Sequence, residues 1–291
     1  MRESVGFIGL GIMGRPMARH LLDAGFPLAV HSRSPGPVQE LAAAGARSCP
    51  SPAETASGSD IVITMLPDTP DVELVVLGGH GIVEGIEPGS LVIDMSTIDP
   101  LATRRIAGEV ATKGGAMLDA PVSGGEKGAV EGTLSIMVGG DEVDVARAMP
   151  IFEAMGSTIV HVGGSGAGQV AKACNQLVVG STIQAVAEAL ALAERAGVDA
   201  RKVREALLGG FAGSKILEIH GQRMIDRAFS PGFRARLHLK DARIVQGTAD
   251  QVDASTPAFA VVADALRRLV DGGGGDLDHS ALYTLLAQEG S

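Results

Sequence analysis

Residues 4–14 read SVGFIGLGIMG, and this stretch decides the fold of the first half of the chain. Its first part, Ser4–Gly9, has the apolar character of a short buried strand. The rest is a G-x-G-x-x-G motif, and a helical pattern follows it as far as Gly25. A second apolar strand, Pro27–His31, comes next. A glycine turn between a strand and a helix, with a second strand behind, predicts a dinucleotide-binding βαβ unit.

The three glycines of this motif have separate expected roles. Gly9 allows the tight turn, Gly11 lets the backbone approach a pyrophosphate, and Gly14 lets the helix pack closely on the strand. The amino end of the helix then offers N–H groups and a positive dipole to phosphates. The alternative is a glycine-rich turn without a ligand. The predicted cofactor contacts here are Gly9, Leu10, Gly11, Ile12, Met13 and Gly14.

The residues after the second strand bear on the choice between NAD and NADP. An acidic residue there would hold the ribose hydroxyls of NAD, but this chain has His31-Ser32-Arg33-Ser34. Arg33 with the hydroxyls of Ser32 and Ser34 suits a 2′-phosphate, so the sequence favours NADP. The alternative is that Arg33 stacks on adenine and the protein accepts both cofactors.

Strand and helix patterns continue to alternate, which predicts an α/β fold with a Rossmann-type, doubly wound and mainly parallel sheet. The expected strands are 60–66, 91–95, 117–119, 134–138 and 159–162, and the expected helices are 38–44 and 100–113, with Asp99 or Thr97 as the cap of the latter. Ligands bind beyond the carboxyl ends of such strands. The candidate walls of the cofactor site are therefore Met65-Leu66-Pro67, Met95-Ser96-Thr97 and the segment 120–125.

The third wall contains Ser123-Gly124-Gly125. A small hydroxyl followed by two glycines can turn several backbone N–H groups toward one point, and such a nest binds an anion, for instance a substrate carboxylate. The alternative is a sharp turn without a ligand.

After Gly163–Gly166 the strand pattern stops, which predicts a domain of residues 1–163 and an all-helical domain of residues 164–291. The second domain is built around a long interdomain helix, 166–197. Further helices are expected at 199–208, 215–224, 237–251, 257–271 and 279–288. The run Gly272–Gly275 predicts a flexible surface loop.

The long helix has polar side chains in its first turns. Lys172 and Asn175 share a helix face, and Gln176 adjoins them. This arrangement suits chemistry at the amino end of the helix, whereas the alternative is a core helix whose lysine reaches out to water. A basic patch in the second half leaves a similar choice between a functional cleft and a solvated charged face. It consists of Arg234, Arg236, His238, Lys240 and Arg243, with Asp241 beside Lys240.

Composition narrows the function classes. A formal net charge of −10 disfavours nucleic acid and anionic membranes as main partners. Two cysteines, Cys49 and Cys174, have neither metal-like nor disulfide-framework spacing, so we expect a cytoplasmic protein without a metal site. The most apolar window, Leu177–Ala193, is interrupted by Gln184 and Glu188, and we interpret it as a buried helix rather than a membrane span. An apolar helical domain suggests a homodimer or homotetramer.

Together, the motifs resemble the β-hydroxyacid dehydrogenases along nearly the whole chain. This family includes 3-hydroxyisobutyrate dehydrogenases, tartronate semialdehyde reductases and glyoxylate/succinic semialdehyde reductases. The resemblance is carried by Gly6–Gly14 with Pro16-Met17, by Asp119–Gly125 and by Gly166–Gln176. Within the family, the second half is most similar to the tartronate semialdehyde reductases. The cues are Gly209–Ser214, Pro231-Gly232-Phe233, Leu237–Asp241 and Asp278–Ala281.

The resemblance implies an NAD(P)-dependent reduction of tartronate semialdehyde (2-hydroxy-3-oxopropionate) to glycerate. Lys172 would be the catalytic acid and Asn175 would orient the substrate. The remaining implied substrate contacts are Ser123, Gly124, Gly125, Phe233 and Asp241, and the remaining implied cofactor contacts are Met65, Leu66, Pro67, Thr97 and Lys240. The segment His31-Ser32-Arg33 departs from the many NAD-using members that carry an acidic residue there.

Other functions stay open at this point. A 3-hydroxyisobutyrate dehydrogenase or a succinic semialdehyde/glyoxylate reductase would have the same motifs. Imine reduction on the same fold is disfavoured by a lysine at position 172. A catalytically silent dinucleotide-binding module would bind the cofactor without turning over a hydroxyacid.

Overall fold

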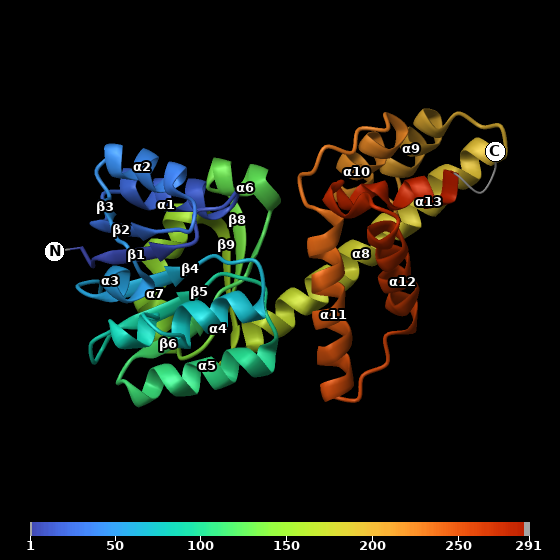
Figure 1. Cartoon of the computed structure of the whole chain (residues 1–291). Helices are drawn as coiled ribbons and strands as arrows, with labels where there is room; N and C mark the ends of the chain where they lie inside the picture. The colour runs from blue at the N-terminus through green and yellow to red at the C-terminus, as the bar shows by residue number, and fades with distance from the viewer. Residues whose placement is uncertain (1, 288–291) are drawn as a thin grey trace. The chain divides into compact units, whose positions relative to one another are not determined.

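The computed structural model describes residues 2–287, and the chain divides into two compact units, Met1–Lys172 and Ala173–Ser291. The long helix α8, Ala167–Arg195, begins in the first unit and continues in the second (Figure 1). The predicted boundary at 163/164 precedes this helix, whereas the division between the compact units falls inside it.

The first unit contains one sheet of nine strands. In chain order they are β1 Val5–Ile8, β2 Leu28–His31, β3 Arg47–Ser48, β4 Ile61–Thr64, β5 Leu91–Asp94, β6 Ala116–Asp119, β7 Val122–Ser123, β8 Leu134–Gly139 and β9 Gly156–Gly163. Their spatial order is β3-β2-β1-β4-β5-β6-β8-β7, and β9 also pairs with β8. The six strands β1–β6 are mutually parallel, which confirms the doubly wound sheet. Strand β8 runs antiparallel to β6 and β7 and parallel to β9.

Helices accompany the strands of this unit on both faces of the sheet (Figure 1). They are α1 Gly14–Asp23, α2 Pro35–Ala43, α3 Pro52–Ala56, α4 Thr69–Leu77, the 3-10 turn η1 Ile82–Glu84, α5 Pro100–Thr112, α6 Gly125–Glu131 and α7 Glu142–Met155. The cap of α5 is Asp99, whose side chain accepts from the N–H groups of Leu101 and Ala102.

The central strands β4 and β5 are buried at every position because both faces of the sheet are covered, and only their last residues, Thr64 and Asp94, are polar. In β4, Ile61 and Ile63 belong to one core with helices α1 and α7, while Val62 belongs to a second core with α4 and α5. This alternation explains why the strand sequence is a continuous apolar run rather than an alternating pattern.

The second unit is helical over its described residues. After α8 it contains α9 Ala200–Leu208, α10 Lys215–Ile225, α11 Ala235–Gln251, α12 Pro257–Asp271, the 3-10 turns η2 Gly274–Asp276 and η3 His279–Leu282, and α13 Tyr283–Ala287. A single core includes Ile183 and Leu190 of α8, Leu239 of α11, and Phe259 and Leu266 of α12.

Two sequence predictions for this unit need correction. The run Gly272–Gly275 is not simply a flexible surface loop, because Gly274 opens η2 and is buried against Leu269. The expected helix 279–288 starts as η3, because the Asp278 side chain accepts from the N–H of Ser280 and initiates a 3-10 turn. It becomes α-helical at Tyr283, and its last expected residue, Gln288, lies outside the described residues.

Candidate active site

The glycine turn after β1 is shaped by close contacts on two sides. Gly9 has φ +99, and a Cβ atom there would lie 2.3 Å from the carbonyl oxygen of Met65. A Cβ on Gly14 would lie 1.9 Å from the carbonyl oxygen of Gly9. At Gly11, by contrast, an added Cβ would have no described atom within 4 Å. The turn is therefore packed tightly against the protein at Gly9 and Gly14 and open at Gly11, the position predicted to approach a pyrophosphate.

The helix behind this turn suits a phosphate. Helix α1 has no acidic residue in its first turn, so its positive end is not neutralised by the chain itself. Leu10 is buried beneath the turn, Met13 is half-buried and Ile12 is exposed. These residues fit a dinucleotide cofactor, whose phosphates bind N–H groups at such a helix end.

The segment after β2 is mixed in its exposure. His31 turns inward, and its Nδ1 lies 2.9 Å from the carbonyl oxygen of Cys49. The side chain of Arg33 is 83% exposed and lies 3.7 Å from Asp71 of α4. Ser34 precedes α2 without using its hydroxyl as a cap. An acidic group thus lies beside Arg33, although it comes from another part of the chain than the second strand.

The loops after β4 and β5 are joined by hydrogen bonds. Thr64 Oγ1 and the N–H of Ser96 both donate to Asp94 Oδ1, at 2.8 and 3.1 Å. The N–H of Leu66 donates to Ser96 Oγ at 2.9 Å. Two of the predicted walls, Met65-Leu66-Pro67 and Met95-Ser96-Thr97, are therefore connected beyond the carboxyl ends of the neighbouring strands β4 and β5.

Asp119, at the carboxyl end of β6, fastens the amino end of α8 to the sheet. Its Oδ1 accepts from the N–H of Gly166 at 2.7 Å, and its Oδ2 accepts from the N–H of Gln169 at 2.9 Å. Burial raises the pKa of Asp119 to about 6, although these two hydrogen bonds act in the opposite direction. A Cβ on Gly168 would lie 2.4 Å from the carbonyl oxygen of Met137, so the helix touches the strand backbone here.

The side chain of Gln169 ties the same helix end to the loop after β5. Its Nε2 donates to the carbonyl oxygen of Ser96 at 2.9 Å, and its Oε1 accepts from the N–H of Ile98 at 3.1 Å. Lys172 follows one helical turn later and is buried, with 7% of its surface exposed. The contacts of Asp119 and Gln169 thus hold the start of α8 at the carboxyl ends of the strands and fix the position of Lys172.

The segment Ser123-Gly124-Gly125 forms a turn between β7 and α6. Gly124 and Gly125 both have positive φ values, +138 and +62, which require glycine or strain. Gly124 is exposed, whereas Ser123 and Gly125 are half-buried. Glu126 in the first turn of α6 places a negative charge beside this predicted carboxylate site, so its role as an anion nest stays a prediction.

In the second unit, four side chains form a continuous polar chain between α8 and α11. Asn175 Nδ2 donates to Gln176 Oε1 at 2.8 Å, and Gln176 Nε2 donates to Asp241 Oδ2 at 2.5 Å. Lys240 Nζ lies 2.7 Å from Asp241 Oδ1. Gln176 and Asp241 are 5% and 2% exposed. Three of these residues were predicted site residues, and Gln176 connects them.

The basic patch of α11 is only partly a solvated charged face. Arg234 and Arg236 fit that interpretation, because both are half-exposed and pair with Asp276 at 3.0 and 3.1 Å. The interpretation is wrong for the buried His238 and for the Lys240–Asp241 pair. The helical period explains the division, since these residues lie on the inward face of α11 and the arginines on its outer face.

Three histidines and Asp278 form a buried cluster that sequence spacing did not reveal. His279 Nδ1 lies 3.0 Å from His238 Nδ1, and His279 Nε2 lies 3.4 Å from His220 Nε2. His220 Nδ1 is 3.5 Å from Asp278 Oδ1. Burial and the neighbouring His238 lower the pKa of His279 well below its usual value. The predicted substrate residue Phe233 packs on this cluster, with ring centroids 5.4 Å from His279 and 5.9 Å from His238.

The ligand atoms of His220, Asp278 and His279 are close enough together to suit a metal ion. However, Asp278 already receives the N–H groups of Gly232 and Phe233, and Arg223 lies 3.0 Å from its Oδ2. Its Oδ1 accepts from the hydroxyl and the N–H of Ser280. The His220 hydrogen bond, His279 and Ser280 together outweigh burial and hold the pKa of Asp278 far below its usual range. We therefore interpret the group as a structural cluster that joins α10, α11 and η3.

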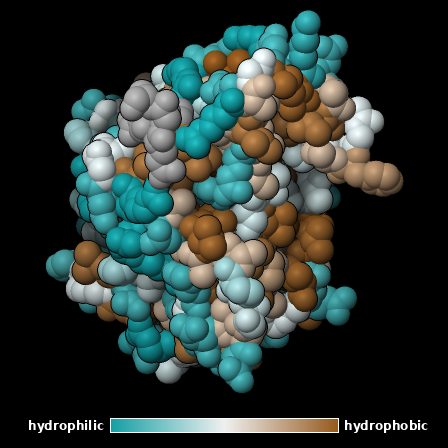
Figure 2. Space-filling model, turned by 90° about the vertical axis from the view of Figure 1, so that its right-hand side faces the viewer, coloured by the Kyte–Doolittle hydropathy of each residue, from teal (hydrophilic) through white to brown (hydrophobic). Residues whose placement is uncertain are grey.

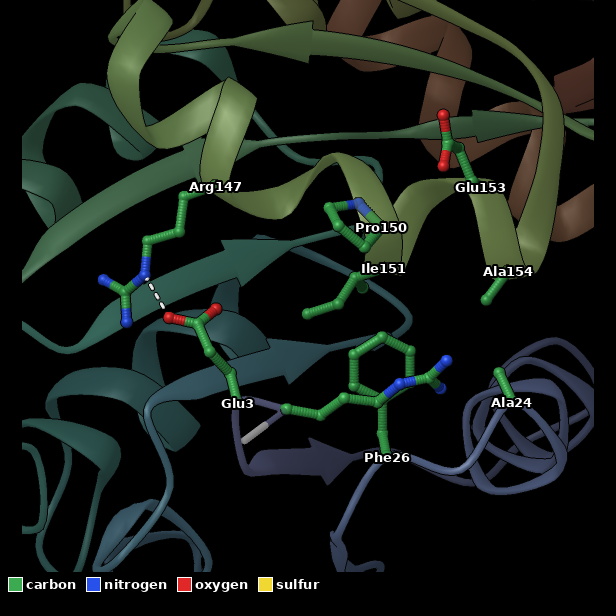
Figure 3. Close-up of a pocket in the computed structure, with 9 residues that line it drawn as sticks. Glu3, Ala24, Phe26, Arg147, Pro150, Ile151, Glu153 and Ala154 are labelled. Carbon is green, nitrogen blue, oxygen red and sulfur yellow. Dashed lines mark hydrogen bonds and ion pairs between the residues drawn. The ribbon is translucent and has the colours of Figure 1, made fainter.

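A separate pocket lies in the first unit, near the amino ends of the strands. It has a volume of about 520 Å³ and is lined by Phe26 and Ile151 among others (Figure 3). Arg147 Nε donates to Glu3 at 2.7 Å beside it. Glu3 and Phe26 precede β1 and β2, so this pocket is at the amino ends of the strands and contains no predicted site residue.

Among the described helices, α8 is the one that is long and apolar enough to cross a membrane by those two criteria alone. In its most apolar window, 44% of the residues are buried. Core helices of soluble proteins also meet these criteria, so this finding is weak support for a membrane span.

Comparison with known proteins gives consistent results for both halves. Residues 4–164 match the family described as the NAD binding domain of 6-phosphogluconate dehydrogenase. Residues 166–286 match the NAD-binding family of NADP-dependent 3-hydroxyisobutyrate dehydrogenase. The chain is 48% identical to the 2-hydroxy-3-oxopropionate reductase of Escherichia coli K12 over 283 residues, 97% of this chain and 96% of that protein.

Two further relatives show the range of substrates. A Pseudomonas aeruginosa NAD-dependent L-serine dehydrogenase is 40% identical, with 97% of each chain covered. The structure of Mycobacterium tuberculosis 3-hydroxyisobutyrate dehydrogenase with L-serine has a TM-score of 0.90 and 34% identity, covering 98% of this chain and 99% of that one. These matches confirm the family resemblance and the fold. The chain therefore belongs to the 3-hydroxyisobutyrate dehydrogenase-like β-hydroxyacid dehydrogenases, which are NAD(P)-dependent oxidoreductases acting on CH–OH groups.

Proposed function

We propose that this enzyme reduces 2-hydroxy-3-oxopropionate (tartronate semialdehyde) to glycerate, with Lys172 as the general acid. The observation that supports this chemistry is the position of Lys172. It is buried and lies one helical turn after Gln169, whose contacts with Asp119 and Ser96 hold the start of α8 at the carboxyl ends of the strands. The choice of substrate is supported by the E. coli reductase, which is 48% identical over nearly the whole chain.

The proton transfer follows from the charge that the reaction creates. A nicotinamide cofactor, when bound, would supply a hydride for the aldehyde carbon. The carbonyl oxygen gains negative charge, and the Lys172 ammonium donates a proton to it, so the product is an alcohol. In the oxidising direction the neutral amine takes that proton back. Burial of Lys172 limits competition from water at the reacting oxygen.

The remaining site residues would bind and orient the substrate. Ser123, Gly124 and Gly125 would hold the carboxylate through their backbone N–H groups and the serine hydroxyl. Asn175, one helical turn after Lys172, would orient the carbon chain. Phe233 and Asp241 would be further substrate contacts.

The cofactor would lie on the glycine turn, with Met65-Leu66-Pro67 and Thr97 on the nicotinamide side and Lys240 as a further contact. We propose that NADP is preferred, because Arg33 is largely exposed beside Ser32 and Ser34 and can pair with a 2′-phosphate. Asp71, 3.7 Å from Arg33, lowers this preference by competing for the guanidinium, so NAD also binds.

The test is a comparison of substrates with both cofactors. Oxidation of NADPH and NADH is measured with tartronate semialdehyde, methylmalonate semialdehyde, succinic semialdehyde and glyoxylate. We expect the highest kcat/KM with tartronate semialdehyde, and a higher value with NADPH than with NADH. A higher value for any other aldehyde would overturn the substrate assignment, and equal values for the two cofactors would overturn the NADP preference.

A second candidate is oxidation of L-serine or 3-hydroxyisobutyrate. It is favoured by the 40% identical L-serine dehydrogenase and by the M. tuberculosis structure with L-serine. Reduction of NAD⁺ or NADP⁺ with these acids, measured beside glycerate, separates the two candidates.

We place the enzyme in the cytoplasm, since Cys49 and Cys174 are both free thiols, as in a reducing compartment.

A further inference from the structure

The relatives differ in one substituent of their substrates. Glycerate, L-serine and 3-hydroxyisobutyrate share a carboxylate and a terminal CH₂OH group, but C2 carries a hydroxyl, an ammonium or a methyl group. Two of these substituents donate hydrogen bonds, and the methyl group does not. Selection within the family therefore depends on what the protein presents to the C2 substituent.

The polar chain between α8 and α11 has only one possible direction. The Asp241 carboxylate, paired with Lys240, accepts hydrogen bonds and does not donate them. Gln176 must therefore turn its Nε2 toward Asp241, at 2.5 Å. Its Oε1 then faces Asn175 and accepts from Asn175 Nδ2 at 2.8 Å. Because the Nδ2 atom of the Asn175 side-chain amide faces Gln176, its Oδ1 atom points away from Gln176.

Burial fixes this direction. Gln176 and Asp241 are 5% and 2% exposed, so water cannot replace the bonds between them. Reversing the Gln176 amide would set its oxygen against the carboxylate and its NH₂ against the NH₂ of Asn175, which leaves buried polar groups unsatisfied. Asn175 itself is half-buried and is accessible to a ligand.

We propose that Gln176 is a positioning residue, which turns the Asn175 carbonyl oxygen toward the C2 substituent and so favours substrates with a hydrogen-bond donor there. This inference rests on the proposed function, in which Lys172 reacts at the C3 oxygen. Asn175 follows Lys172 by one helical turn on the same face, and C2 follows C3 in the substrate. Hydroxyl and ammonium groups donate to the amide oxygen, whereas a methyl group leaves that oxygen without a partner.

The experiment measures kcat/KM for oxidation of four acids that differ only at C2. They are glycerate, serine, 3-hydroxyisobutyrate and 3-hydroxypropionate, with each chiral acid in both enantiomers. The variants are Gln176→Leu, which removes both hydrogen bonds, and Gln176→Glu. Gln184→Leu on the same helix, where Gln184 bonds only Glu188 in the described structure, is the matched control.

For Gln176→Leu we expect the glycerate/3-hydroxyisobutyrate and serine/3-hydroxyisobutyrate ratios to fall about tenfold, as for the loss of one oriented hydrogen bond. The kcat/KM values for glycerate and serine fall, whereas those for 3-hydroxyisobutyrate and 3-hydroxypropionate stay within about threefold of the wild-type values. Gln184→Leu leaves the ratios unchanged. An equal loss for all four acids would show that Gln176 merely ties the helices together, and it would overturn the proposal.

Gln176→Glu gives a test that does not depend on the leucine variant folding. A protonated carboxyl at this position donates to Asp241 and accepts from Asn175, as the amide does, whereas its ionised form repels Asp241. We expect the discrimination to be present at low pH and lost as the new carboxyl ionises, with no such step in the wild type. A ratio that is independent of pH in this variant contradicts the proposal.

Failure of this proposal is distinguishable from failure of the proposed function. If the wild type prefers L-serine and Gln176→Leu lowers the serine ratio, the inference holds and the glycerate assignment fails. If the wild type prefers glycerate and the ratios do not move, the assignment holds and the inference fails.

Discussion

Lys172 is the residue on which the proposed proton transfer depends. For Lys172→Ala we expect kcat to fall by about 10²- to 10⁴-fold, the usual contribution of a general acid. NADPH affinity should persist, because the glycine turn lies elsewhere in the first unit. Steady-state kinetics and NADPH fluorescence titration measure the two quantities, with the exposed Lys202→Ala as control. A kcat within tenfold of the wild-type value would contradict the assignment of Lys172 as the general acid.

Gly14 and Gly11 allow a matched pair of substitutions. Gly14→Ala places a Cβ atom 1.9 Å from the Gly9 carbonyl oxygen, and we expect a loss of about 3 kcal/mol in unfolding free energy from this overpacking. Gly11→Ala enters open space, so stability should be unchanged while the Kd for NADPH rises at least about tenfold, because the pyrophosphate approaches there. Thermal unfolding with and without NADPH measures both. Equal destabilisation by the two substitutions would contradict the separate roles.

Sequence patterns pointed to candidate site residues but not to the contacts that hold them in place. The glycine turn and the first turns of α8 are continuous stretches with a recognisable spacing. Asp119 and Gly166, in contrast, are distant in the chain, and the bond between them depends on the sheet order. The histidine cluster is dispersed in the same way, since His220, His238 and His279 come from three different elements. Proximity of this kind is a result of folding and has no local signal.

At the scale of elements, strong periodicity gave reliable predictions. The buried strands β1, β4 and β5 and the helices α5, α8, α9 and α12 lie within a few residues of their expected bounds. Helix α7, Glu142–Met155, was missed, and it contains Pro150, a residue that usually ends a helix. The two-residue strand β7 was also missed, because its pairing with β8 is a tertiary contact rather than a local preference.

The Asp119 anchor of α8 carries a pH dependence. Because its folded pKa is raised from 3.8 to about 6, the folded state binds a proton more tightly than the unfolded state between these values. Stability therefore falls as pH rises through this window, by about 3 kcal/mol for a shift of about two units. In Asp119→Asn this contribution disappears.

Urea unfolding at pH 4.5, 5.5 and 7.0 checks this prediction. The wild type should gain stability relative to Asp119→Asn as the pH is lowered, because only the wild type takes up the extra proton. A constant difference between the two proteins at all three pH values would show that Asp119 is not protonated in this range.

At the scale of the whole molecule, the second unit exposes several apolar side chains. They include Val178 and Leu192 of α8, Val252, Val261 of α12 and Phe211, which is fully exposed. Figure 2 shows hydrophobic side chains, in brown, in several patches between hydrophilic ones on one face of the molecule. Exposed apolar surface of this kind is typical of contacts between subunits.

We expect a homodimer or homotetramer in solution. Light scattering coupled to size-exclusion chromatography should give a mass of two or four times the 29.6 kDa of one chain. A single species with the mass of one chain at micromolar concentration would refute this expectation.

The histidine cluster affects which of the two units loses stability first as the pH falls. His279 stays neutral when folded but takes up a proton near pH 6.5 when unfolded, so its contribution to the helical unit is present above that pH and lost as the pH falls. Asp119 acts with the opposite sign in the first unit. Hydrogen exchange at pH 7.5 and 5.0, corrected for intrinsic rates, should therefore show residues 199–286 losing protection while 4–164 keep theirs. One polypeptide would then have a helical half that opens in mild acid and an α/β half that becomes more stable there, so the proton concentration would loosen the first while the second stays folded.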